Sequence, residues 1–165
     1  MMRIISLLST LFYDAPESEV DSMEMHFKTE YRWTSESRGL VELGEGRANL
    51  EVAPPPQFKG PKGLWSPEDL YVSSIETCFF LTLMFFLKQS KVELFEYSSK
   101  ADGLLERVDG KMSFPQVDLY PTLVSDADPA KIEQLMEKAE QDCLVARSVK
   151  TRIVLHPTIE QRTSA

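Results

Sequence analysis

The segment that follows residue 26 alternates apolar and polar residues as a half-buried β-strand does. From Phe27 to Trp33 every second residue is an aromatic or a threonine, and charged residues stand between them. A period of two places alternate side chains on opposite faces of a strand. Two more strand-like segments follow at 40–43 and 48–52. The pattern predicts an antiparallel meander that ends at the prolines 54–56, because proline cannot donate a hydrogen bond to a strand ladder.

A helix start is the clearest local signal in the chain. Ser66 is a favourable N-cap, Pro67 suits the first helical position, and Asp69 completes a capping box. We expect this helix to run to about Ser90. Its second half contains the apolar run 78–87, which is too short to span a bilayer. Because the run is apolar on nearly every side, it predicts a helix buried at the centre of the fold.

The remaining sequence predicts two strands, a second helix and a last strand. A hairpin turn at Asp109-Gly110 joins strands expected at 92–108 and 111–124. Asp128-Pro129 then opens a helix, and a final strand is expected at 152–156. The order βββ-α-ββ-α-β indicates an α+β fold with antiparallel sheets around a long buried central helix. Two modest sheets cannot cover such a helix on all sides, which favours a homodimer.

Length and composition fit one domain, since 165 residues are enough to bury a core. We expect residues 1–22 to be a tail or extension and residues 23–165 to form the single domain. The first residues faintly resemble a signal peptide, but no convincing cleavage site precedes the acidic stretch 14–21. We therefore expect a cytoplasmic protein, and stable structural disulfides are rare in that compartment.

The charge balance limits the partners of the chain. A net charge of -8 and a pI of about 4.8 repel phosphate backbones and anionic lipids, so neither nucleic acid nor a membrane is expected as a partner. The two histidines, His26 and His156, have no neighbouring ligand at metal-binding spacing. The sequence contains no glycine-rich nucleotide loop and no serine hydrolase signature. We expect no metal and no cofactor.

Two cysteines, Cys78 and Cys143, are the candidate chemistry of the chain. They indicate a redox couple, a structural disulfide or two unrelated thiols. Cys78 lies twelve positions after Ser66, too far along the helix for its dipole to lower the thiol pKa. Burial among its phenylalanine neighbours raises that pKa. A reactive Cys78 would therefore need a cation from elsewhere, whereas an unreactive Cys78 would be a small hydrophobe in the core.

The cation could come from an arginine of the meander. Arg38, at a turn, is the preferred candidate, and Arg32 and Arg47 are the alternatives. Glu68 could orient such an arginine, but it precedes Cys78 by ten positions, about 15 Å along a continuous helix. Cooperation between these groups would require a helix break or a residue from a partner chain. In the simpler interpretation, Glu68 is an ordinary acidic residue in a first helical turn.

The block from Phe58 to Leu70, followed by Glu76-Thr77-Cys78-Phe79, resembles the OsmC/Ohr family of thiol peroxidases. In that family a Pro-Glu pair precedes the first cysteine by the same interval as here. The second cysteine follows a helix about 60 residues later, which matches Cys143. The resemblance covers roughly residues 25–160. The chain departs from the family in having Ser66 where asparagine is commoner, and Leu144-Val145-Ala146 where Pro-Val-Ser often follows the second cysteine.

The resemblance implies an intertwined α+β homodimer with a peroxidase site at the subunit interface. Cys78 would attack a hydroperoxide, Cys143 would resolve the sulfenic acid as a disulfide, and an external dithiol would reduce it. Arg38 and Glu68 would hold the thiolate. Apolar side chains expected to line the approach favour organic hydroperoxides over hydrogen peroxide; they are Trp65, Phe79 and Phe80. The alternatives are a non-catalytic protein that binds a small apolar ligand between subunits, and an exported protein with a structural disulfide.

Overall fold

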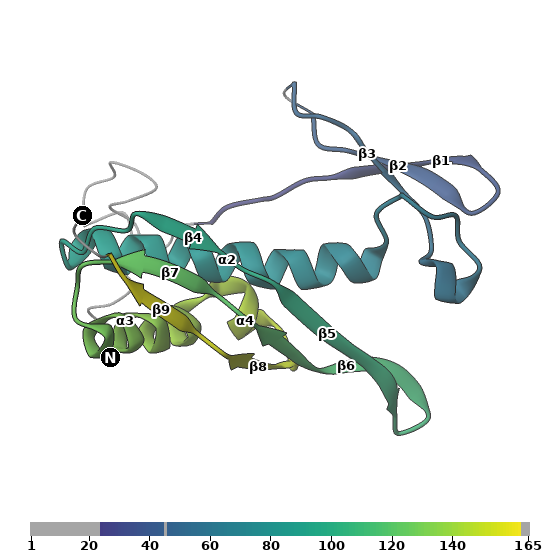
Figure 1. The fold of residues 1–165 in the computed structure, drawn as a ribbon. Helices are drawn as coiled ribbons and strands as arrows, with labels where there is room; N and C mark the ends of the chain where they lie inside the picture. The colour runs from purple at the N-terminus through teal and green to yellow at the C-terminus, as the bar shows by residue number, and fades with distance from the viewer. Residues whose placement is uncertain (1–23, 45, 163–165) are drawn as a thin grey trace. The chain divides into compact units, whose positions relative to one another are not determined.

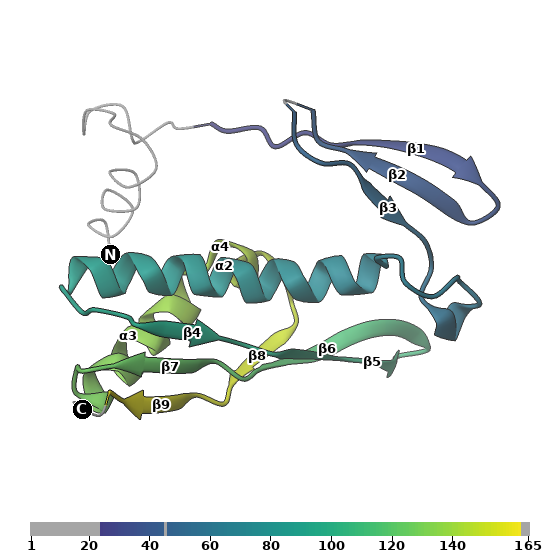
Figure 2. The ribbon, with the colours of Figure 1, turned by 45° about the horizontal axis from the view of Figure 1, so that its top comes forward.

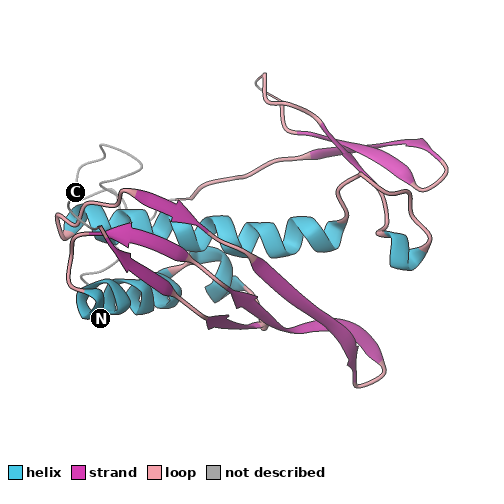
Figure 3. Ribbon diagram, viewed as in Figure 1, coloured by secondary structure: helices cyan, strands magenta, loops and turns pink. Residues whose placement is uncertain are grey.

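The computed structural model describes residues 24–44 and 46–162. The predicted tail, residues 1–22, lies outside the described residues. The described chain has the mixed helix and strand content expected of an α+β fold. It divides into two compact units, with the boundary between Ala53 and Pro54. The prolines that were expected to end the meander thus begin the second unit. Figure 3 distinguishes the helices, strands and loops of both units.

The first unit is the predicted antiparallel meander (Figure 1). Its strands are β1 (Glu30–Ser35), β2 (Arg38–Glu42) and β3 (Leu50–Val52), in the order β1-β2-β3. Strand β1 is exposed along its whole length, and Tyr31 and Trp33 keep 62% and 66% of their surface. The half-buried strand predicted from the alternation is therefore not half-buried within one chain. Its aromatic residues remain without cover.

The second unit begins with a short 3₁₀ helix, η2 (Pro56–Phe58), and the long helix α2 (Pro67–Gln89). The predicted capping box is confirmed. The backbone N–H of Asp69 donates to Ser66 Oγ at 3.1 Å, and the backbone N–H of Ser66 donates to Asp69 Oδ2 at 2.9 Å. One face of α2 is buried, with Ile75, Phe79, Leu83 and Leu87 at most 2% exposed. Leu81, on another face, keeps 57% of its surface.

The two long strands predicted at 92–108 and 111–124 are each divided in two, and a strand that was not predicted, β9 (Thr158–Gln161), follows the predicted final strand. The strands are β4 (Glu96–Ser98), β5 (Ala101–Val108), β6 (Lys111–Leu119), β7 (Thr122–Ser125), β8 (Arg152–Leu155) and β9 (Thr158–Gln161). They form two three-stranded sheets, β4-β7-β9 and β5-β6-β8. Backbone hydrogen bonds continue the pairing across the breaks, including the reciprocal pair between Lys100 and Tyr120. Pro121 and Pro157 stand at two of the breaks, where a missing N–H interrupts a ladder.

The direction of pairing follows from the connections. Strands β5 and β6 are antiparallel and joined at the predicted turn, where Asp109 and Gly110 have φ of 50° and 81°. Two consecutive positive φ values are those of a type I′ hairpin. Strands β8 and β9 pair with β6 and β7 in parallel, a departure from the purely antiparallel sheets expected. Two helices precede β8, and such a crossover returns the chain in the same direction.

Those two helices pack on α2. Helix α3 (Pro129–Asp142) begins at the N-cap Asp128, as predicted, and α4 (Leu144–Ser148) follows after a single residue. Helix α4 was not expected from the sequence. The buried face of α3 is formed by Ile132, Leu135, Met136 and Ala139. In Figure 2, α2 runs along one face of the sheets, and both α3 and α4 contact it.

Candidate active site

The packing of α3 and α4 against α2 brings the two cysteines together. Cys78 lies in the fourth turn of α2 and is half-buried. Cys143 is the single residue between α3 and α4, so it caps both helices, and it is 0% exposed. Both thiols are free. Of the two cysteines, Cys78 is therefore the one that a molecule from solvent can reach.

Hydrogen-bond donors around the Cys78 sulfur favour its thiolate. The Cys143 thiol has the largest effect, followed by the backbone N–H groups of Val145 and Leu144 and then the Thr82 hydroxyl. Together they lower the pKa of Cys78 to about 6, although partial burial acts in the opposite direction. The expectation that burial raises this pKa is therefore correct in sign, but burial is outweighed. The conclusion that only a cation could lower the pKa was wrong, because neutral donors suffice.

Cys143 has the opposite character. Its pKa is raised, first by the interaction with Cys78 and then by burial. One proton thus stays on Cys143 while the charge resides on Cys78. This division of roles is what a nucleophilic thiolate and a resolving thiol require. The short helix α4, which supplies two of the N–H donors, has no clear signal in the sequence. The i, i+4 spacing of Cys78 and Thr82 could have indicated the hydroxyl.

Glu68 lies in the first turn of α2, away from the thiols. Ten residues of continuous helix separate it from Cys78, about 15 Å by helical rise. Within the described part of the chain, its Oε2 atom is buried and has no hydrogen-bond partner. A buried carboxylate oxygen without a donor is energetically unfavourable, so it marks a position where a donor is missing from the single chain.

The candidate arginines all belong to the first unit. Arg38 begins β2 and is exposed. Arg32 donates to Glu42 Oε1 at 2.7 Å, and Arg47 donates to the carbonyl oxygen of Leu43 at 2.7 Å. Arg32 and Arg47 thus have partners within the meander. The role of Arg38 at the thiolate stays a prediction.

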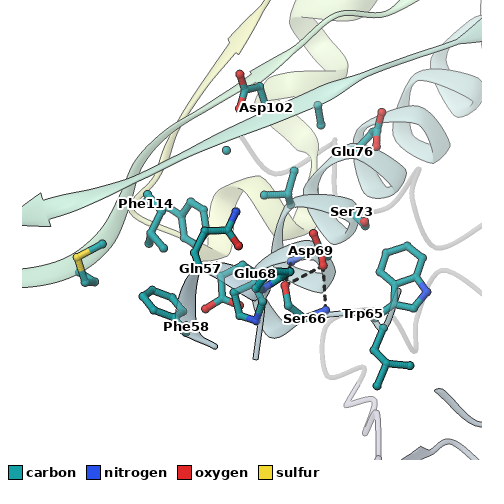
Figure 4. Close-up of a pocket in the computed structure, with 18 of the residues that line it drawn as sticks. Gln57, Phe58, Trp65, Ser66, Glu68, Asp69, Ser73, Glu76, Asp102 and Phe114 are labelled. Atoms are coloured by element: carbon teal, nitrogen blue, oxygen red, sulfur yellow. Dashed lines mark hydrogen bonds between the residues drawn. The ribbon is translucent and has the colours of Figure 1, made fainter. Parts of the chain in front are cut away.

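A cavity of about 970 Å³ lies at the start of α2 (Figure 4). Carboxylates of four residues line it, together with aromatic rings; the acidic residues are Glu68, Asp69, Glu76 and Asp102. In Figure 4, Phe58 and Phe114 lie to one side of the Ser66–Asp69 hydrogen bonds and Trp65 to the other. Neither cysteine lines this cavity. It is therefore separate from the thiol pair within one chain.

The three residues expected to line the approach of the substrate lie in different surroundings. Trp65 lines the cavity and is 46% exposed. Phe79 is 2% exposed in the core. Phe80 is half-buried and packs on Tyr97, with ring centroids 4.2 Å apart.

Within residues 24–44 and 46–162, no group of three histidine, cysteine or acidic side chains is placed to hold a metal ion.

Comparisons with known proteins place these features in a family. The family model described as OsmC-like protein matches residues 60–157, which contain α2, both cysteines and the strands β4 to β8. A curated relative is the uncharacterized protein YmaD of Bacillus subtilis (strain 168). It is 21% identical over 135 residues, which cover 79% of this chain and 90% of that protein.

Solved structures show the same fold. An OsmC-like protein of unknown function from Vibrio cholerae superposes with a TM-score of 0.74 at 18% identity, covering 81% of this chain and 99% of that one. An organic hydroperoxide resistance protein from Elizabethkingia anophelis gives 0.68 at 21% identity, covering 85% and 100%. One from Legionella pneumophila gives 0.67 at 20% identity, covering 82% and 98%. Since the family model spans more than half of the chain, the protein belongs to the OsmC-like family.

Proposed function

We propose that this protein is a cysteine-based thiol peroxidase that reduces organic hydroperoxides. Membership in the OsmC-like family supports a peroxidase-related role. The observation that carries the proposal is the placement of a low-pKa, half-exposed Cys78 beside a buried, protonated Cys143. A thiolate attacks a peroxide, and a neighbouring thiol can then capture the oxidised sulfur.

The reaction balances with these two thiols and one external reductant. The Cys78 thiolate attacks the outer peroxide oxygen, an S–O bond forms, and the O–O bond breaks. The outer oxygen keeps its proton in the sulfenic acid, and the alkoxide that leaves takes a proton from water to become an alcohol. The Cys143 thiol then attacks the sulfenic acid of Cys78, which forms the disulfide and releases water. An external dithiol returns both cysteines to thiols and is itself oxidised to a disulfide. In this scheme the protein acts in the cytoplasm, without metal, cofactor, nucleic acid or membrane.

The proposed active assembly is a homodimer. Glu68 carries a buried oxygen without a partner, and Leu81, Tyr31 and Trp33 expose large apolar surfaces. A second copy of the chain would cover these side chains, and Arg38 would supply the donor that Glu68 lacks. Arg38 would then stabilise the thiolate and the developing oxyanion, with Glu68 orienting its guanidinium group.

A stoichiometric oxidation tests the proposal. Reduced protein is mixed with one equivalent of cumene hydroperoxide, and free thiols and intact mass are followed within seconds. We expect loss of both thiols and a mass decrease of about 2 Da, because the disulfide forms with loss of two hydrogens. In Cys143→Ser the reaction should stop at a sulfenic acid that dimedone traps, and Cys78→Ser should not react. Survival of both thiols in the native chain would refute the peroxidase.

The substrate preference is tested separately. We expect faster turnover with cumene hydroperoxide than with hydrogen peroxide, because the exposed apolar side chain of Leu81 stands three positions after Cys78, on a neighbouring part of the α2 surface. A clear preference for hydrogen peroxide would contradict this expectation.

A second candidate function is the binding of a small ligand without catalysis. The cavity beside Phe58 and Phe114 favours it, since its volume suits a small organic molecule. Slow and indiscriminate alkylation of Cys78, together with a ligand that copurifies with the protein, would support the binding protein over the peroxidase.

A further inference from the structure

Thr82 stands one helical turn after Cys78 on the same face of α2. Its Oγ1 atom donates a hydrogen bond of 2.9 Å to the carbonyl oxygen of Cys78. The side chain is 9% exposed, so water competes little for the hydroxyl. In a helix, residues four apart are neighbours on the surface, which also places this hydroxyl beside the Cys78 side chain.

The hydroxyl has one proton and two possible acceptors, the carbonyl oxygen and the sulfur of Cys78. The carbonyl already accepts the backbone N–H of Thr82 within the helix, so it can do without the hydroxyl. A thiolate is charged, and hydrogen bonds to charged acceptors are about twice as strong as neutral ones. When Cys78 is ionised, the sulfur is therefore the better acceptor.

We propose that Thr82 holds the Cys78 thiolate: its hydroxyl proton turns from the Cys78 carbonyl to the Cys78 sulfur when the sulfur is ionised. In the sulfenic acid or the disulfide the sulfur carries no charge, and the proton returns to the carbonyl. The Thr82 hydroxyl thus stabilises Cys78 only in its reduced, ionised state. The inference rests on the proposed role of Cys78 as the attacking thiolate.

The electrostatics of the site agree with this geometry. The Thr82 hydroxyl is one of four groups that lower the pKa of Cys78, after the Cys143 thiol and the N–H groups of Val145 and Leu144. Its contribution is the smallest of the four. A small but measurable effect is therefore expected, distinct from the larger effect of removing Cys143.

The chain offers a matched control on the same helix. Thr77 Oγ1 donates to the carbonyl oxygen of Ser73 at 2.7 Å, which is the same kind of bond to the preceding turn. Thr77 is adjacent to Cys78 in sequence but exposed, and its hydroxyl is not among the groups that act on the Cys78 sulfur. Thr77→Val removes a comparable hydroxyl without touching the thiolate.

The test is the pH profile of Cys78 alkylation by iodoacetamide, measured by mass on the full chain. Only the thiolate forms the S–C bond with loss of iodide, so the midpoint reports the pKa. In Thr82→Val we expect the midpoint to move up by roughly half a unit to one unit, with a rate about three- to tenfold lower at pH 5. Thr82→Ser should restore the profile of the native chain, and Thr77→Val should leave it in place.

A Thr82→Val profile that superimposes on the native one would overturn the inference, as would an equal shift in Thr77→Val. If the valine variant fails to fold, Thr82→Ser and Thr82→Ala form a second pair, since both lack the methyl group and only serine keeps the hydroxyl. The alkylation profile does not depend on whether the protein reacts with a peroxide. A shifted profile together with thiols that survive cumene hydroperoxide would refute the peroxidase and leave the role of Thr82 standing.

Discussion

At the scale of residues, the charge of Cys78 depends on groups that are distant in sequence. Cys143 and the N–H groups that follow it are 65 to 67 positions away, and only Thr82 is local. None of these groups is cationic. The site therefore stabilises a thiolate by hydrogen bonds, and an arginine from elsewhere would add to an ionisation that the single chain already favours.

The pH dependence of Cys78 follows directly. With a pKa near 6, the thiol is mostly ionised at pH 7. We expect alkylation of the native chain to rise with pH, reach half of its maximum near pH 6 and level off by pH 8. In Cys143→Ser, which removes the largest stabilising group, the midpoint should move upward unless the serine hydroxyl replaces the thiol as a donor; Cys143→Ala avoids that ambiguity. A native midpoint above pH 8 would contradict the assignment.

The same pKa shift makes stability depend on pH. Since the pKa of Cys78 is lower in the folded chain than the value of about 8.5 in an unfolded one, ionisation stabilises the fold. This contribution is fully present above pH 8.5 and is lost as the pH falls through 6. The free energy of unfolding, measured in urea, should therefore differ between the reduced native chain and Cys78→Ala by more at pH 8.5 than at pH 5. A difference in the free energy of unfolding that is the same at both pH values would show that folding does not lower the pKa of Cys78.

At the scale of elements, the short helix α4 gives the site its N–H donors. It begins at Leu144, directly after the buried Cys143, so its first N–H groups have no partner within the helix. They are positioned by the contact of α4 with α2. A proline at the position of Leu144 would lack the N–H that acts here.

Leu144→Pro is therefore a selective test of one donor. Proline suits the first position of a helix, and the Cys143 backbone at φ -62° and ψ 117° already fits a residue before proline. We expect the variant to fold and the alkylation midpoint of Cys78 to rise. Leu144→Ala, which shortens the same exposed side chain but keeps the N–H, is the control. Equal midpoints in the two variants would exclude this N–H as a donor.

The capping box of α2 makes a separate prediction about stability. Ser66 is 1% exposed and shares three hydrogen bonds with Asp69, two of which involve its hydroxyl group. Replacing an N-cap serine by alanine typically costs about 1 kcal/mol, and burial of the partner groups increases the loss. We expect Ser66→Ala to lower the free energy of unfolding in urea by about 1–2 kcal/mol. Ser74→Ala, on the exposed face of α2, should change it by less than about 0.5 kcal/mol.

At the scale of the whole molecule, several large apolar side chains remain uncovered in one chain. Leu81 on α2 and Tyr31 and Trp33 on β1 are each more than half exposed. Isolated exposed apolar residues are common, but apolar side chains of this size on β1 and on α2 favour contacts with another chain. The buried oxygen of Glu68 without a donor points in the same direction. The proposed homodimer accounts for all four.

Sedimentation equilibrium tests this assembly. We expect the native chain to sediment as a dimer and Leu81→Glu to sediment as a monomer, because a charge at the centre of an apolar contact has no partner there. Lys88→Glu, on the exposed last turn of α2, controls for a change of charge on the same helix. A native chain that stays monomeric at micromolar concentration would contradict the dimer and leave Glu68 without its proposed donor.

The sequence by itself determined the local elements, because their signals are short-range. The capping box at Ser66, the turn at Asp109-Gly110 and the start of α3 at Asp128 each depend on residues within one turn of each other, and the structure has all three. The antiparallel meander was predicted from the alternation of apolar and polar residues. The breaks that divide the long strands, and the parallel pairing of β8 and β9, depend on neighbouring strands and were not predicted.

Only the tertiary structure decided the environment of the side chains. The sequence singled out both cysteines but not their proximity, since a hydrogen bond across 65 positions leaves no spacing signal. His156 likewise lacks a carboxylate nearby in sequence, yet it lies 2.7 Å from Asp118 of β6. The pKa of Cys78 depends on the balance of burial and donors at one point in space. That balance exists only when α4 packs on α2, so the lowered pKa of this thiol follows from the tertiary structure and not from the sequence pattern.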